Sequence, residues 1–272
     1  MPKTKAADAC CSTGCEHRFD HNNLDDLMAH NKKWAASMKA TNPEFFTQLN
    51  KGQAPEFLYI GCADSRVPAN QIMGLAPGEV FVQRNVGNQA GHTDMNVMAC
   101  IEYAVKSLGV KTILVCGHYN CGAVRAALTM PARTPGVVNC WISDIREARN
   151  QAAAELAELD EDAAVSRLCE LNVMRQVFNV CTSPVVQEAW ADGKELHVQG
   201  LIFDLKDGIL HRLTGLINNA TDVYSLRFDG GSVKAGVAKP APAKKATAKA
   251  AAKAAPAAEA KTERPRKRRA AA

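Results

Sequence analysis

The sequence lacks long hydrophobic runs, and its first residues lack the apolar core of a secretion signal. No uninterrupted apolar stretch approaches the ~18 residues that a membrane span needs, so no membrane span is expected. The start from Met1 to Asp8 is polar, and it is not an Arg- and Ser-rich transit segment either. We therefore expect an intracellular, reducing compartment, most simply the cytoplasm, while import into an organelle stays open.

Aromatic residues are scarce, at 6% of the chain, and the ten cysteines do not form a disulfide framework. They are scattered and follow no secretion signal, which argues against disulfides. Cys10, Cys11, Cys15 and His17 are close enough to bind a metal or to oxidise, but an unstructured thiol-rich end is the simpler interpretation. Five others lie in apolar or helical surroundings and are expected to be free core thiols: Cys100, Cys116, Cys140, Cys169 and Cys181.

Positive charge is concentrated at one end of the chain. Of 33 Lys and Arg and 28 Asp and Glu, the last 39 residues hold 12 basic and 2 acidic ones. The first 233 residues are left with 21 basic and 26 acidic residues, so the overall charge of +5 does not indicate a basic folded domain.

These contrasts predict three regions. Residues 1–22 form a flexible, Cys-rich segment, residues 23–233 form the folded domain, and residues 234–272 form an Ala-, Lys-, Pro- and Arg-rich tail. The tail lacks the large apolar residues that a core needs, so we expect it to be disordered. Its basic end favours nonspecific contact with anionic surfaces or nucleic acid, although without aromatic residues it cannot stack on bases.

The folded region alternates predicted strands and helices. Apolar residues at helical spacing from Leu24 to Met38 predict an amphipathic N-terminal arm that stops before Pro43. Two segments, 196–204 and 209–213, flank the turn signal at 206–208 and predict a hairpin. Other elements follow the same reasoning: strands over 57–61, 79–84 and 111–117, and helices over 95–108, 121–130, 139–182 and after Pro184. We predict an α/β fold with a mostly parallel central sheet, an antiparallel edge strand and a helical cover.

Two motifs with reactive side chains directly follow predicted strands. Cys62, Asp64 and Arg66 follow the first strand, and His118 and Cys121 follow the third. Ligands bind beyond the carboxyl ends of parallel strands, and two sulfurs with one imidazole nitrogen form a donor set that zinc prefers. Three protein ligands with a fourth position left for water, or for Asp64, are typical of catalytic zinc sites.

Other types of site fit these motifs less well. A cysteine phosphatase needs five residues between its Cys and Arg, whereas three separate Cys62 from Arg66. A thiol hydrolase that pairs His118 with one cysteine would leave the other without a role. Buried cysteines and a satisfied histidine at strand ends, beside an ordinary salt bridge, remain the plain structural alternative.

The two motifs resemble those of the β-class carbonic anhydrases. The resemblance runs over about 23–215 and includes the blocks 51–53, 77–85 and 101–105. It implies one Zn²⁺ per subunit on Cys62, His118 and Cys121. It also implies a dyad of Asp64 and Arg66 beside the metal, in which Arg66 keeps the carboxylate ionised to orient the hydroxide.

The resemblance further implies a substrate pocket. Gln53, Phe81 and Tyr103 match the pocket positions of plant-type members, which favours a zinc open to water over a zinc bound by Asp64. Gln53 and the backbone N–H of Gly122 are expected to donate hydrogen bonds to substrate oxygens. Without the resemblance, Phe81 and Tyr103 would be read as core residues and Gln53 as a surface residue.

The expected function is therefore the reversible hydration of carbon dioxide to bicarbonate and a proton by zinc-bound hydroxide, which makes the chain a lyase. Hydrolysis of carbonyl sulfide or carbon disulfide on the same scaffold is the nearest alternative. A non-catalytic scaffold whose tail binds nucleic acid is an alternative of another class. In the family the N-terminal helix crosses onto a second subunit, so a homodimer or a higher homo-oligomer is expected.

Overall fold

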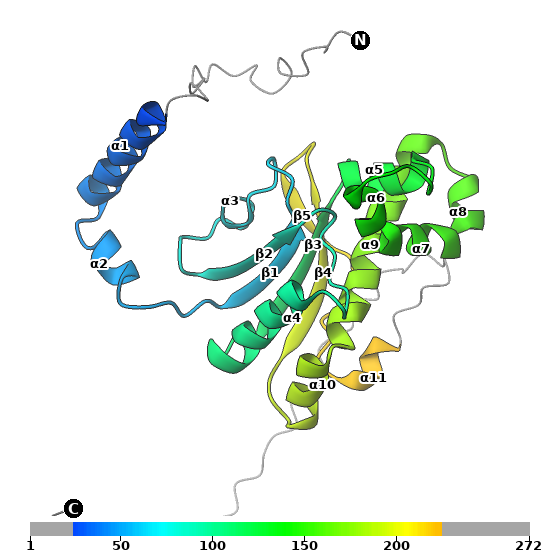
Figure 1. Ribbon diagram of the computed structural model, residues 1–272. Coiled ribbons are helices and arrows are strands. Elements are labelled where there is room, and N and C mark those ends of the chain that lie inside the picture. Colours follow the sequence, from blue (N-terminus) through cyan, green and yellow to red (C-terminus); the bar gives the residue numbers. More distant parts are fainter. Residues whose placement is uncertain (1–23, 225–272) are drawn as a thin grey trace, which may run out of the picture. The chain divides into compact units, whose positions relative to one another are not determined.

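The computed structural model describes residues 24–224, which form one sheet flanked by helices (Figure 1). The predictions for residues 1–22 and for the basic tail lie outside this described range. Within it, no helix is long and apolar enough to cross a membrane.

The sheet has five strands in the order β2-β1-β3-β4-β5. Its first four strands run parallel and β5 pairs antiparallel with β4, which confirms the predicted topology. In the connecting turn, Gly208 has a φ of 75°, and Asp204 and Asp207 accept backbone hydrogen bonds from Lys206 and Ile209. The strands are β1 (Phe57–Cys62), β2 (Val80–Asn85), β3 (Thr112–His118), β4 (His197–Asp204) and β5 (Ile209–Arg212).

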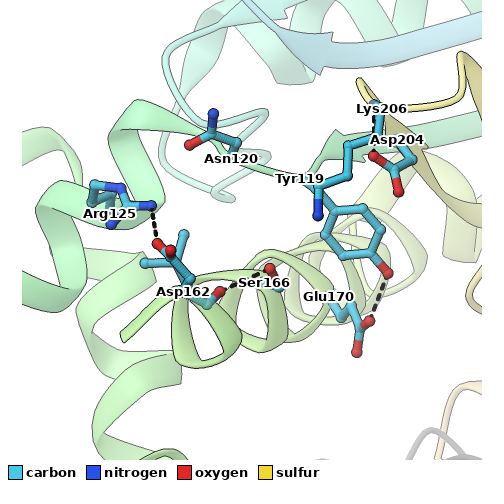
Figure 2. A pocket seen from close by; sticks show the side chains of 9 residues that line it. Tyr119, Asn120, Arg125, Asp162, Ser166, Glu170, Asp204 and Lys206 are labelled. Atoms are coloured by element: carbon cyan, nitrogen blue, oxygen red, sulfur yellow. Dashed lines mark hydrogen bonds and ion pairs between the residues drawn. The ribbon is translucent and has the colours of Figure 1, made fainter. Parts of the chain in front are cut away.

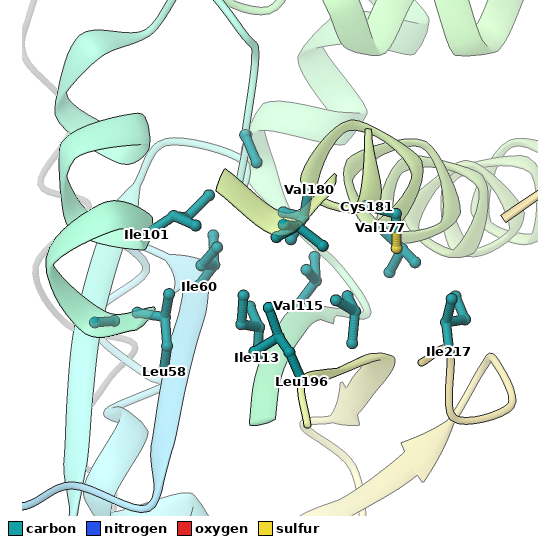
Figure 3. Close-up of a cluster of buried hydrophobic side chains, with 14 of the residues drawn as sticks. Leu58, Ile60, Ile101, Ile113, Val115, Val177, Val180, Cys181, Leu196 and Ile217 are labelled. Atoms are coloured by element: carbon teal, nitrogen blue, oxygen red, sulfur yellow. The ribbon is translucent and has the colours of Figure 1, made fainter. Parts of the chain in front are cut away.

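The central strands are buried on both faces, as parallel strands usually are. On one face, Leu58, Ile60 and Val115 pack against Val177 and Val180 of a long helix (Figure 3). On the other face, Tyr59 and Leu114 pack with residues of the segment after β1. Apolar runs in the sequence therefore became central strands because both of their faces are covered.

Helices surround this sheet. The expected helical stretch 139–182 is divided into four helices. The last of them begins at Glu161, after the N-cap residue Asp160, whose carboxylate accepts a hydrogen bond from the Ala163 N–H. The helices between the N-terminal arm and this last helix are α3 (Ala69–Met73), α4 (Met95–Glu102), the π-helix η1 (Tyr103–Ser107), α5 (Gly122–Thr129), α6 (Val137–Trp141), α7 (Ser143–Gln151) and α8 (Ala153–Ala157). The remaining ones are α9 (Glu161–Cys181), α10 (Pro184–Ala191) and α11 (Ala220–Val223).

The N-terminal arm consists of α1 (Asp25–Thr41) and α2 (Phe45–Leu49), as the periodicity predicted for α1. Trp34 meets Phe46 edge to face, with ring centroids 5.8 Å apart. No residue of α1 is buried, and Leu24 and Trp34 stay exposed. Apart from this contact with α2, most of the apolar side of α1 is thus exposed within the described part of the chain.

The described cysteines are free thiols, but not all of them are in the core. Cys116, Cys169 and Cys181 are buried as expected, and Cys100 is half-buried. The core prediction was wrong for Cys140, which is exposed. It lies on the single-turn helix α6, whose Val137 is exposed as well.

Close packing of α9 on the sheet requires glycine at position 117. A Cβ there would lie 2.5 Å from Cγ2 of Val173. We predict that Gly117→Ala destabilises the protein by about 1–3 kcal/mol through overpacking, measured by urea unfolding. Gly215→Ala is the control, because a Cβ there would meet no atom within 4 Å. Equal unfolding midpoints for the two variants would contradict this account.

Candidate active site

Parallel pairing of β1 with β3 brings the two reactive motifs together. Gly61 lies opposite Cys116, so Cys62 and His118 both end their strands at the same edge of the sheet. Cys121 follows as the N-cap residue of α5. The Sγ atoms of Cys62 and Cys121 are 3.9 Å apart, and the three ligand atoms lie within 4.8 Å of one another.

The imidazole of His118 is oriented for a metal. Its Nδ1 lies 3.0 Å from the carbonyl oxygen of Tyr119, so a proton on Nδ1 donates to that oxygen and leaves Nε2 as the free base. Nε2 is buried and has no hydrogen-bond partner among residues 24–224. An orphaned buried nitrogen beside two thiols fits zinc, which satisfies all three donors at once.

The two thiols affect each other's protonation. The pKa of Cys62 is lowered chiefly by a hydrogen bond from Cys121, and the pKa of Cys121 is raised chiefly by its bond to Cys62. Both shifts come from the same contact between the two sulfurs. Because zinc binds thiolates, loading of the site releases protons from the thiols.

Asp64 lies beside this group but is held by Arg66. Nη2 of Arg66 donates to Oδ2 at 2.8 Å, its Nε donates to Oδ1 at 3.0 Å, and its backbone N–H also donates to Oδ1 at 2.9 Å. These bonds, the side-chain bond first, lower the pKa of Asp64 to about 2. Oδ2 stays 3.7 Å from Nε2 of His118, so an ionised carboxylate faces the metal position while both its oxygens are occupied.

Arg84 of β2 is a site residue to which the sequence analysis gave no role. Its Nε donates to the carbonyl oxygen of Cys62 at 2.7 Å, and its Nη2 donates to that of Asp64. These bonds fix the backbone between the first metal ligand and the dyad.

The neighbouring Val86 is apolar but 41% exposed, and it follows Asn85, the register partner of Cys62. Val86 thus places apolar surface at the metal end of the sheet.

Three predicted pocket residues lie away from the metal end of the sheet: Gln53, Phe81 and Tyr103. Phe81 pairs with Leu58, four residues before Cys62, which is about 13 Å along the strand. Tyr103 begins η1 and its ring centroid is 5.8 Å from that of Phe81, while Gln53 precedes β1 and is exposed. Of the predicted substrate-binding residues, Gly122 is at the metal end, as the first residue of α5.

A polar cavity of about 500 Å³ lies behind the loop that joins His118 to Cys121. Residues of that loop, of α5, of α9 and of the β4–β5 connection line it, and they include Tyr119, Asn120 and Arg125 (Figure 2). The metal-binding donors do not line this cavity, so it is distinct from the metal site.

A family model described as carbonic anhydrase matches residues 57–210. The chain belongs to this family. The matched range contains the three metal ligands, Asp64 and Arg66. Two curated carbonic anhydrases illustrate the similarity. That of Emericella nidulans is 44% identical and the match covers 77% of this chain and 93% of the relative, and that of Saccharomyces cerevisiae is 37% identical over 72% and 91%.

Solved structures assign the chain to the β-class. A Coccomyxa β-carbonic anhydrase in complex with acetazolamide is 49% identical, with a TM-score of 0.72 over 75% of this chain and 91% of that one. A structure of two tetrameric β-carbonic anhydrases from Sordaria macrospora gives 40% identity and a TM-score of 0.68, covering 72% and 99%. β-Carbonic anhydrases are zinc enzymes, in agreement with the donor set described above.

The ligand assignment predicts a selective loss of zinc. Cys121→Ala should remove zinc and activity together, and Cys62→Ala and His118→Ala should do the same, as measured by metal analysis after dialysis. The Cys121 side chain makes no cap hydrogen bond, so the change tests the metal more than α5. Cys116→Ala, another buried cysteine, is the control and should keep its zinc. Full zinc in the Cys121→Ala protein would overturn the assignment.

Proposed function

We propose that this β-carbonic anhydrase interconverts carbon dioxide and bicarbonate at a zinc ion held by Cys62, His118 and Cys121. The observation that carries this proposal is the set of three buried donors beside a carboxylate that Arg66 holds off the metal position. Zinc in such a site lowers the pKa of water and supplies a hydroxide near neutral pH.

Asp64 and Arg66 orient the nucleophile in this proposal. The ionised carboxylate of Asp64 accepts a hydrogen bond from the attacking hydroxide. A lone pair of the hydroxide oxygen is thereby directed toward carbon dioxide. Arg66 prevents Asp64 from moving onto the metal. Two thiolates cancel the formal charge of zinc, which makes water bound to it less acidic. The nearby cations Arg66 and Arg84 offset this loss of acidity.

The amino terminus of α5 is the proposed site for the developing charge. Its first N–H groups have no partner within the helix, and the helix dipole favours negative charge there. Gly122, the first residue of the helix, is exposed, so a ligand can approach its backbone. A hydrogen bond to a substrate oxygen would strengthen as charge grows on it.

A stopped-flow hydration assay of the zinc-loaded chain tests the function together with the dyad. Asp64→Ala should keep its zinc and lose roughly 100-fold in turnover, since orientation of the nucleophile is a general-base type of contribution. Arg66→Ala should behave similarly. Asp162→Ala is the matched control, because Asp162 pairs with Arg125 on the surface. Loss of zinc in Asp64→Ala would make Asp64 a structural ligand and contradict its proposed role.

The same assay separates the alternatives. Carbonyl sulfide and carbon disulfide are linear molecules that suit the same nucleophile, and their hydrolysis by the same preparation is measured in parallel. If either one is hydrolysed faster than carbon dioxide is hydrated, it replaces carbon dioxide as the proposed substrate. A zinc-loaded chain without activity on all three would favour a scaffold.

We also propose that the active form is a homo-oligomer whose sites lie at subunit interfaces. Phe81 and Tyr103 lie far from the zinc ligands of their own chain, and Tyr103 is 49% exposed. Leu27, Met28 and Trp34 on the apolar side of α1 are exposed as well. A second copy would cover α1 and bring Phe81 and Tyr103 to the first copy's zinc. The tetrameric relatives of Sordaria macrospora support such an assembly.

Mixed oligomers test this arrangement. Cys62→Ala lacks the metal site and Tyr103→Ala lacks part of the proposed pocket, so each protein alone should be impaired. After the two are unfolded and refolded together, one site per mixed dimer combines intact zinc ligands with an intact pocket. We expect activity well above the mean of the separate proteins. Activity that stays at that mean, or a stable active monomer in light scattering, would contradict the proposal.

The tail at 234–272 is proposed to contact anionic surfaces or nucleic acid without sequence preference. All proposed site residues lie between Gln53 and Gly122, and exposed charges are screened within about 10 Å at 0.1 M salt. A chain that ends at Val233 should therefore keep its zinc and its hydration rate. Its binding to heparin should fall steeply, and that of the full chain should weaken with added salt. A tenfold loss of rate on truncation would place the tail in the active assembly.

A further inference from the structure

Helix α9 holds the metal-binding loop from behind through a chain of polar side chains. The hydroxyl of Tyr119 donates to Oε1 of Glu170 at 2.7 Å (Figure 2). Nη1 of Arg167 donates to Oε2 of the same carboxylate at 2.8 Å, and Nε of Arg167 donates to Glu155 of α8. Tyr119 is thus linked across α9 to a second helix.

The backbone of Tyr119 is engaged on both sides. Its N–H donates to the carbonyl oxygen of Phe203 in β4 at 3.0 Å, and its own carbonyl oxygen accepts from Nδ1 of His118 at 3.0 Å. A hydrogen bond at Nδ1 sets the plane of a metal-binding imidazole and so the direction of Nε2. Any rotation of the Tyr119 peptide would therefore turn the ligand.

The next residue has an uncommon backbone conformation. Asn120 has a φ of 56°, a left-handed conformation that a non-glycine residue adopts at an energetic cost. Its carbonyl oxygen lies 3.3 Å from Nη2 of Arg66, so the same loop also contacts the dyad. The bonds of the loop to Glu170 and Arg66 help to hold it in this conformation.

The anchor is shielded, unlike the neighbouring surface pairs. The side chains of Arg167 and Glu170 are 19% and 25% exposed, whereas Arg125 pairs with an Asp162 side chain that is 86% exposed. Shielded charge pairs hold their geometry more firmly than exposed ones, which contribute little. The Tyr119 ring also packs against the apolar cluster under α5. Phenylalanine could pack there too, so the hydroxyl serves the bond to Glu170.

We propose that Tyr119, Glu170 and Arg167 are positioning residues of the zinc site, which hold the His118–Cys121 loop so that Nε2 of His118 stays directed at the metal. The inference rests on the proposed zinc enzyme, but it concerns metal binding and is measurable without activity. His118 is then supported by side chains of α9 as well as by the backbone of its own loop.

Zinc release and the cobalt spectrum test the proposal on the full chain. Tyr119→Phe removes the hydroxyl alone, and Glu170→Gln keeps an acceptor but loses the ion pair with Arg167. Both should release zinc to a chelator about 3- to 10-fold faster, by analogy with other supports of metal ligands. Both should also alter the visible spectrum of the cobalt-substituted protein and lower kcat more than they change KM. Ser166→Ala is the control, because Ser166 lines the same cavity and its hydroxyl donates to the backbone of its own helix.

A double mutant shows whether the residues act as one unit. If they do, Tyr119→Phe with Glu170→Gln should release zinc no faster than the more affected single variant. The proposal is overturned if both single variants keep the wild-type release rate and cobalt spectrum, if Ser166→Ala changes them equally, or if the two effects multiply. A wild-type chain that binds zinc but does not hydrate carbon dioxide would overturn the proposed function and leave these metal readouts valid.

Discussion

Cys62 and His118 meet because β1 and β3 pair in parallel, with Gly61 opposite Cys116. Parallel strands end at the same edge of the sheet, so two residues 56 positions apart reach one point without a dedicated loop. Cys121 adds the third donor because α5 begins there. Arg84 reaches across from β2 to the carbonyl oxygens of Cys62 and Asp64. The metal centre thus depends on the register of three neighbouring strands.

This geometry couples metal binding to folding. Two buried thiols 3.9 Å apart and an imidazole nitrogen without a partner are costly to bury as they stand. Zinc turns the same three groups into ligands, so part of its binding free energy stabilises the fold. Asp64 lies beside these groups, and its bonds to Arg66 hold it as an ionised carboxylate.

Much of the site was predictable because its residues are close in sequence and follow strands. Cys62, Asp64 and Arg66 lie within five positions, and the chemistry of their side chains indicates a metal. The role of Arg84 was not predictable, because it acts on backbone oxygens of another strand. The distance of Phe81 from the zinc ligands follows from strand register, which periodicity does not give. Exposure of Cys140 depends on how the segment 137–182 divides into separate helices.

Zinc K-edge X-ray absorption of the full-length, zinc-loaded protein tests the central claim most directly. We expect two sulfur neighbours at about 2.3 Å and two nitrogen or oxygen neighbours at about 2.0 Å. The sulfurs belong to Cys62 and Cys121, and the lighter atoms to His118 and a water molecule. A first shell with fewer than two sulfur atoms would contradict the ligand set and the mechanism built on it.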